Sequence, residues 1–268
     1  MKHRLEISAF SSWAIVMIFE ILWSRILWSY VWTSIYVWTN IIALILWALA
    51  LWYYVWWKLS DRGVSIIQVW FLFNISGLLF AILPLIKDPI LIILSENIWD
   101  IRVSSFIATL ILFTPASFIL GMIQPICTKI HIKDIESSWK SIGIIWSIGT
   151  IWSIIGTMAA WFILIPFFGI NNLLLGLAIF CMVLSIFILG KNALSFNLLL
   201  FCVIMLIFFT KSFETEALKN SHIFNFDSQY SHISIQDGNQ NGIKVRNLFV
   251  DNIPHAGRYL ESEELLYD

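Results

Sequence analysis

Two ionisable residues, Glu20 and Arg25, interrupt an otherwise apolar stretch near the amino terminus. A charged side chain at membrane depth is costly, so by default it marks either a functional site or a pairing site. Two structural explanations are open. The two side chains pair with each other, or Arg25 extends its charged head to the membrane interface. We favour a structural role for both residues.

The other residues that could do chemistry form no recognisable site. Asn74 and Gln124 are polar residues in apolar runs, and hydrogen bonds between helices account for both. Cys127, Cys181 and Cys202 also lie in apolar runs without paired spacing, so we expect small core residues rather than disulfides or ligands. The five histidines have no metal-binding spacing, and no phosphate loop or nucleophile elbow occurs. The sequence therefore predicts no metal site and no cofactor in this chain.

The composition is that of a chain surrounded by lipid. Hydrophobic residues make up 59% and charged residues 12%, and the mean hydropathy is +0.84. A soluble domain has about a quarter of its residues charged, so most of this surface faces something other than water. The formal net charge of −1 provides no field that would attract nucleic acid. We expect a multi-pass protein of the cell membrane whose main partner is the lipid bilayer, and self-association stays open.

The apolar runs predict an all-α polytopic membrane bundle of about seven transmembrane helices in residues 1–210, because about 20 apolar residues are needed to cross a bilayer. The candidate spans are 7–29, 36–57, 64–86, 101–128, 142–168, 170–190 and 194–210. The weakest assignments are the run 194–210 and the stretch 89–94, for which a re-entrant segment is the alternative. Pro115, Pro125 and Pro166 predict helix kinks.

Lysine and arginine residues gather at one end of the predicted spans, and this bias predicts the orientation. The richer end holds Lys2, Arg4, Lys58, Arg62, Lys129, Lys133, Lys140 and Lys191, and the other end holds Lys87, Arg102 and Lys211. The richer end is therefore predicted to be cytoplasmic, with the amino terminus inside. Seven spans would then place residues 211–268 outside.

Residues 211–268 have the composition of a soluble segment. The runs 232–235 and 244–250 alternate between apolar and polar residues, which is the period of a strand. Residues 237–242, Asp-Gly-Asn-Gln-Asn-Gly, are typical of a turn. We predict a short C-terminal β-hairpin segment that packs on something larger, because a lone hairpin is only marginally stable in water.

Several motifs occur in order along residues 8–169. They are Glu20-Ile21-Leu22 with Arg25, residues 30–39, residues 58–62, the run 115–125 with Leu120-Gly121-Met122, and the run 143–169. The first three resemble the first two helices of membrane-bound spermidine synthase-like proteins. The last two resemble the fourth-helix and fifth-helix signatures of that family.

The tail is similar to the β-hairpin region that opens the soluble domain of spermidine synthases. The similar segments are 230–235 and 248–251, with Asn252 where glycine is usual. The resemblance implies transfer of an aminopropyl group from decarboxylated S-adenosylmethionine to a diamine. It also implies substrate-binding roles for Tyr230, Asp251, His255 and Tyr267. A turn residue after a strand is the alternative for Asp251.

The 268 residues depart from the family where catalysis would need them. The Gly-rich turn that holds the nucleotide is missing, and so are the acidic residues that hold the amines. We therefore expect an inactive fragment, with decarboxylated S-adenosylmethionine and a polyamine bound only by a longer protein that includes the catalytic domain. The leading prediction is the membrane module of a spermidine synthase-like aminopropyltransferase. The rival is a small transporter or membrane scaffold with a polar interaction tail. A transporter should show interrupted helices at matching positions, and the sequence contains no convincing internal repeat.

The tryptophans fit a membrane bundle poorly. The chain has 15 Trp and only 12 Gly, although chains average about 7% glycine and Trp belongs at the membrane interface. Trp47 and Trp152 fall in mid-span, and glycine at positions 52 and 152 would complete small-residue motifs with Ala48 and Gly156. Similar proteins tend to have glycine at the positions of Trp28, Trp32, Trp47, Trp52, Trp56, Trp57, Trp139, Trp152 and Trp161, but tryptophan at Trp38.

We therefore predict that most of these codons are UGA, read as glycine in the source organism. The alternative is a Trp-rich protein with interfacial belts. If the prediction holds, a structure with tryptophan at these positions should show the rings pushing the second and fifth helices away from their neighbours or facing the lipid.

Overall fold

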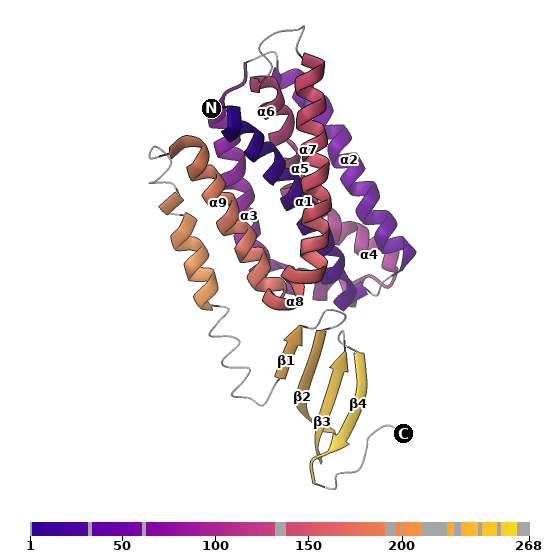
Figure 1. Ribbon diagram of the computed structural model, residues 1–268. Coiled ribbons are helices and arrows are strands. Elements are labelled where there is room, and N and C mark those ends of the chain that lie inside the picture. Colours follow the sequence, from indigo (N-terminus) through magenta and orange to yellow (C-terminus); the bar gives the residue numbers. More distant parts are fainter. Residues whose placement is uncertain are drawn as a thin grey trace.

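Six helices long and apolar enough to cross a membrane dominate this computed structural model (Figure 1). It describes residues 2–31, 34–60, 63–131, 138–190, 197–198, 200–210, 224–227, 232–240, 243–250 and 253–261. The first three spans are α1 (Lys2–Val31), α2 (Ile35–Ser60) and α3 (Ile66–Asn97). The fourth consists of α4 (Ile101–Ala108), the π-helix η1 (Thr109–Phe113), α5 (Thr114–Gly121) and α6 (Ile123–His131). The fifth consists of α7 (Ser138–Ala159), the π-helix η2 (Ala160–Leu164) and α8 (Ile165–Phe168), and the sixth is α9 (Ile170–Leu189). The expected all-α polytopic bundle is confirmed.

The seventh candidate span is shorter in the structure than in the prediction. The apolar helix Leu200–Thr210 falls below the length of the other spans, and residues 194–196 and 199 lie outside the described residues. Figure 1 shows this helix beside α9, running from the end of the bundle that holds the amino terminus towards the opposite end. This direction is the one that a seventh span would take, but the described helix is too short to count as a span, so the structure has six candidate spans rather than seven.

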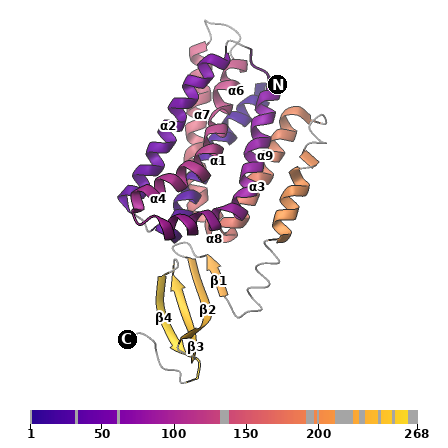
Figure 2. The ribbon, with the colours of Figure 1, turned by 180° about the vertical axis from the view of Figure 1, so that it is seen from behind.

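The third helix is longer than the predicted 64–86. It continues as one helix to Asn97, with Pro84 and Pro89 inside it. Proline removes a backbone hydrogen bond and bends a helix, and Figure 2 shows the last part of α3 turned across the end of the bundle. The stretch 89–94 is therefore the end of the third helix and not a separate re-entrant segment.

Proline also explains the two π-helices. The N–H of Thr114 donates to the carbonyl of Thr109, five residues earlier, directly before Pro115. The N–H of Ile165 donates to the carbonyl of Ala160 in the same way, directly before Pro166. Each proline lacks an N–H, so the preceding turn widens to keep its backbone bonded. Kinks are predicted at Pro115, Pro125 and Pro166; a π-turn directly precedes Pro115 and Pro166, and near Pro125 the helix breaks at Met122.

An aromatic cluster fills the centre of the bundle and joins α1, α3 and η1. The ring of Phe19 lies 4.9 Å from both Phe80 and Phe113, measured between centroids. Trp23 stacks on Phe113 at 6.0 Å, and its indole N–H donates to Thr109 Oγ1 at 3.1 Å. Lipid tails are as apolar as these rings, so close packing rather than exclusion of water favours the contact.

Small residues bring α1 and α7 together. A Cβ atom at Gly156 would lie 2.9 Å from the carbonyl oxygen of Ala14, so only glycine fits there. Gly149 and Ala160 are also buried, but Trp152 is 45% exposed. The stripe that contacts α1 therefore runs through Gly149, Gly156 and Ala160, and the expected motif of position 152 with Gly156 does not form this contact.

The C-terminal strands form a four-stranded antiparallel sheet in the order β1-β2-β3-β4 (Figure 1). The strands are β1 (Phe224–Asp227), β2 (His232–Gln240), β3 (Ile243–Val250) and β4 (Ile253–Tyr259). The predicted hairpin is confirmed as β2–β3, and β1 and β4 extend it on both sides. Residues 237–240, predicted as part of the turn, belong to β2 instead. There Asp237 pairs with Arg246, and two hydrogen bonds of 2.6 and 2.8 Å join the side chains. These bonds to Asp237 raise the pKa of Arg246 above its ordinary value.

Candidate functional site

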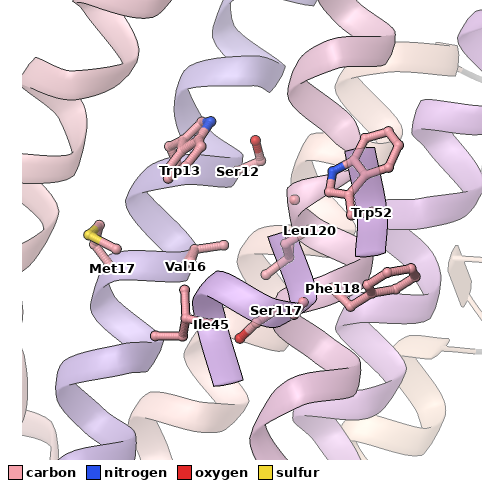
Figure 3. Close-up of a pocket in the computed structure, with 11 residues that line it drawn as sticks. Ser12, Trp13, Val16, Met17, Ile45, Trp52, Ser117, Phe118 and Leu120 are labelled. Atoms are coloured by element: carbon pink, nitrogen blue, oxygen red, sulfur yellow. The ribbon is translucent and has the colours of Figure 1, made fainter. Parts of the chain in front are cut away.

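A cavity lies inside the bundle between α1, α2 and α5 (Figure 3). Its volume is about 30 Å³, enough for a water-sized group. Its lining includes Ser12, Trp13, Met17, Trp52, Ser117 and Gly121. Most of this lining is apolar, so a polar atom that faces the cavity has a strong effect on what it can hold.

Ser117 provides such a polar atom. The residue is 6% exposed, and its Oγ has no hydrogen-bond partner among the described residues. Ser76 Oγ on α3 is a second buried hydroxyl without a partner among the described residues, but several other hydroxyls are satisfied by their own helix. Ser12 donates to the carbonyl of Ala9 at 2.8 Å, and Thr109 donates to that of Ser105 at 2.7 Å. A buried hydroxyl left unpaired costs about 1–3 kcal/mol, so Ser117 has much to gain from a ligand in the cavity.

Trp13 and Gln124 join three helices beside this cavity. The Trp13 indole N–H donates a hydrogen bond to Gln124 Oε1 on α6. On α7, a Cβ atom at Gly149 would lie 3.5 Å from Gln124 Nε2 and 3.9 Å from Trp13 Cδ1. Gln124 therefore makes the expected hydrogen bond between helices. That bond also fixes the orientation of the indole ring at the cavity.

Glu20 lies on the face of α1 that lines the cavity. It follows Val16 by four residues, Met17 by three and Trp13 by seven, and these spacings place side chains on one helix face. Glu20 is half-buried and makes no hydrogen bond or ion pair with any described residue. Helical side chains lean towards the amino terminus of their helix. The lining residues Val16 and Met17 precede Glu20 by about one turn on this face, and Glu20 itself is not among the residues that line the cavity.

Arg25 is separated from Glu20 around the helix axis. Five residues correspond to a rotation of about 140° at 3.6 residues per turn, so the two side chains start from different faces. Arg25 is 2% exposed, and its guanidinium carbon lies 5.7 Å from the ring centroid of Trp28. Neither structural explanation from the sequence is seen. Arg25 is buried rather than extended to the interface, and Glu20 does not pair with it.

A polar network at the end of the bundle opposite the amino terminus was not identified from the sequence. The Tyr30 hydroxyl donates to Asp88 Oδ1 at 2.9 Å, and Lys87 forms an ion pair with the same carboxylate. Lys87 is buried, although the predicted third span ends at residue 86 and leaves it outside. The signal was the sequence Lys87-Asp88-Pro89 within an apolar run, which places two charges beside a helix bend.

A separate polar cluster joins α2 to α4. The guanidinium of Arg102 lies 4.2 Å from the ring centroid of Tyr36 and donates to its hydroxyl at 3.1 Å. Asn40 Nδ2 donates to the carbonyl of Arg102 and to Ser105 Oγ, both at 2.8 Å. These residues stabilise one another, and they explain why α2 and α4 begin side by side.

Asn74 takes part in a buried chain of hydrogen bonds between three helices. Its Nδ2 donates to the carbonyl of Trp70 at 2.9 Å and to Ser185 Oγ on α9 at 2.6 Å. Ser185 donates in turn to Asn197 Oδ1 at 3.2 Å. The predicted role of Asn74 in joining helices is confirmed. These hydrogen bonds also anchor Asn197, which precedes the helix Leu200–Thr210.

Of the four residues predicted to bind substrate, the structure describes only His255. His255 is exposed on β4, and Tyr230, Asp251 and Tyr267 lie outside the described residues. Among the described residues, no group of three or more His, Cys, Asp or Glu could hold a metal ion. Cys127 and Cys181 are buried in the bundle as expected, but Cys202 is exposed. Its helix contributes only part of its surface to packing, so the sequence could not distinguish a core position from one that faces lipid.

Comparisons with known protein families, with curated proteins and with solved structures give no match to this chain. The architecture described above is that of a multi-pass membrane protein, since six long apolar helices carry more exposed apolar surface than water would tolerate.

Proposed function

We propose that this chain is the membrane module, with the first sheet, of a spermidine synthase-like aminopropyltransferase. The observation that carries the proposal is the order of elements. Apolar spans that contain the resembling motifs come first, and an antiparallel sheet follows them. The β2–β3 hairpin of that sheet occupies the segment that is similar to the opening of the family's soluble domain.

The proposal assigns catalysis to a nucleotide-binding fold beyond the described sheet. The Gly-rich turn and the acidic residues that this chemistry needs do not occur in the 268 residues. In this proposal the helices anchor the enzyme and the sheet begins its soluble domain. Decarboxylated S-adenosylmethionine is then the aminopropyl donor and a diamine is the acceptor.

The DNA downstream of codon 268 tests the proposal. We expect the same reading frame to encode a Gly-rich strand-turn-helix followed by acidic residues. Membranes that contain the product of the full frame should transfer aminopropyl groups to a diamine, and those with residues 1–268 alone should not. A frame that encodes no such motif would leave the membrane module without its enzyme and contradict the proposal.

A small transporter is a second candidate, and one observation favours it. The fourth and fifth spans are interrupted at matching positions, because each has a π-turn of five residues, then one residue, then proline. Transporter sites are typically built from helices interrupted at matching positions of two repeats, and here the two matching interruptions lie in consecutive spans. In this case Ser117→Cys should react with impermeant thiol reagents applied from either side of a proteoliposome. Reaction from neither side would reject the transporter.

A further inference from the structure

A groove between the first two turns of α3 and the neighbouring α6 is open to the outside of the bundle. Its lining includes Ile67, Gln68, Phe71, Leu72, Met122 and Ile126. We propose that this groove binds one anionic phospholipid, with an acyl chain inside it and the phosphate at its mouth. The inference does not rest on the proposed aminopropyltransferase function.

The groove has the size and polarity for an acyl chain. Its volume is about 280 Å³, and an apolar cavity of about 150 Å³ already binds benzene and excludes water. Among the lining residues, Ile67 and Phe71 are 58% and 51% exposed, whereas Leu72 and Ile126 are buried. In a bilayer the groove therefore opens to lipid, and a hydrocarbon chain is the ligand that fits such a lining.

The groove lies close to one surface of the membrane. Because α3 begins at Ile66 and rises by about 1.5 Å per residue, Leu72 lies within about 9 Å of that beginning. The start of α3 and the end of α6 are at the end of the bundle that holds the amino terminus (Figure 1). The loop charges predict that this end is cytoplasmic, and the cytoplasmic leaflet is the one that carries anionic lipids.

The polar groups at the start of α3 favour an anion. Gln68 Oε1 accepts a hydrogen bond from the Ser65 N–H at 3.3 Å. The amide N–H groups of Gln68 donate to no described residue, so they are available to a phosphate oxygen. Ser65 is the N-cap of α3, and the amino terminus of a helix carries the positive end of its dipole.

Lys129 adds a full positive charge beside the groove. It follows Ile126 by three residues and Met122 by seven, so the three side chains share one face of α6. Lys129 is exposed and lies one turn nearer the end of α6 than Ile126. The first two turns of α3 and the whole of α6 contain no acidic residue that would repel a phosphate. An apolar groove with only donors and a positive charge at its mouth fits an anionic phospholipid better than a neutral one.

Native mass spectrometry of the purified full chain tests the proposal. The chain is released from detergent in the presence of equimolar phosphatidylglycerol and phosphatidylcholine with identical acyl chains. We expect the chain to retain one phosphatidylglycerol about fivefold more often than phosphatidylcholine, the factor that one basic residue near an anionic surface provides. Retention of no lipid, or equal retention of the two, would contradict the proposal.

Two pairs of variants locate the bound lipid. Lys129→Gln should bring the two lipids to parity, and Arg4→Gln is the matched control. It removes the same charge at the same end of the bundle, where the Arg4 guanidinium lies over the Phe187 ring of α9. Ile67→Trp should fill the groove and abolish retention, whereas Ile144→Trp adds the same ring at an exposed position of α7.

Thermal unfolding checks that each variant is folded, and Lys129→Gln decides the matter if Ile67→Trp is not. A preference that Lys129→Gln lowers no more than Arg4→Gln does would show that only the general charge of this end attracts the lipid. That result, or lipid retention unchanged by a folded Ile67→Trp variant, would overturn the assignment.

Discussion

At the scale of single residues, the tryptophans differ sharply in how well they fit. Trp23 is fully buried, hydrogen-bonded to Thr109 and stacked on Phe113. Trp47 and Trp152 are 54% and 45% exposed and face outward, as expected if large rings replaced glycine. Trp52 is 1% exposed and borders a cavity whose neighbouring walls include Ala48 and Gly121. A large ring between small residues beside a void indicates a wedge that holds α2 away from α5.

Replacement of Trp52 by glycine should therefore leave stability unchanged or raise it. An ordinary buried tryptophan costs about 3–5 kcal/mol when truncated, but here α2 could move towards α5 along Ala48 and Gly121. Trp23→Gly is the control and should lose that amount or more. Unfolding of both variants in detergent provides the comparison. A loss at Trp52→Gly equal to that at Trp23→Gly would show that Trp52 is an ordinary core residue.

The codons give an independent result. We expect UGA at positions 52, 56, 152 and 161, and UGG at Trp38. Sequencing the gene reads them directly, and UGG at all five positions would end the recoding hypothesis.

At the scale of elements, contact between helices depends on small residues and buried hydrogen bonds. The second and fifth spans are the least buried of the six, with 29% and 17% of an apolar 18-residue stretch buried against 50% to 56% in the others. These are the two helices that the recoding hypothesis expected to be splayed. The fifth span nevertheless touches α1 closely at Gly156, because glycine has no Cβ atom to hold the two backbones apart.

Gly156→Ala should separate α7 from α1. Its Cβ atom would meet the backbone of Ala14 at 2.9 Å, so a helix and not a flexible side chain has to move. Overpacking of this kind costs about 1–3 kcal/mol. Gly143→Ala on the same helix is the matched control, since a Cβ there meets nothing within 4 Å. Equal unfolding free energies for the two variants would refute the close contact.

At the scale of the whole molecule, the orientation of the sheet is the central question. The loop charges predict that the amino-terminal end of the bundle is cytoplasmic. The last helix runs back from that end, so the sheet is expected on the opposite side (Figure 1). Polyamine chemistry in the cytosol would require the sheet inside, so the two lines of reasoning oppose each other.

Labelling of single cysteines in intact cells decides on which side of the membrane the sheet lies. An impermeant thiol reagent should label a cysteine at position 240 and leave one at position 60 unlabelled until the cells are permeabilised. Labelling at position 60 would reverse the orientation. If neither position is labelled, the number of spans is even and the sheet lies in the cytosol. The Cys202→Ser background avoids reaction of the exposed native thiol.

The purified chain 1–268 should neither bind decarboxylated S-adenosylmethionine nor transfer aminopropyl groups. The nucleotide-binding turn is not among its residues, and His255 is exposed on β4. Calorimetry at micromolar protein measures this directly. Saturable binding of the nucleotide would contradict the prediction and move the active site into this chain.

The sequence by itself determined that the chain crosses a membrane, roughly where the spans lie, and that a hairpin follows them. These are local properties, because the length and period of an apolar run reflect the solvent around that run. It did not determine that α3 continues through two prolines to Asn97. From the sequence alone, a helix bend that is supported by neighbouring helices cannot be distinguished from a loop.

Only the tertiary structure decided which residues meet. The cavity combines residues from three helices, and the chain Asn74–Ser185–Asn197 joins positions more than a hundred residues apart. In lipid, every helix has an equally apolar surface, so neighbours are selected by shape and by a few hydrogen bonds. Such complementarity exists only between packed helices, and for that reason Ser117 could be recognised as a site residue only when α1, α2 and α5 were seen together.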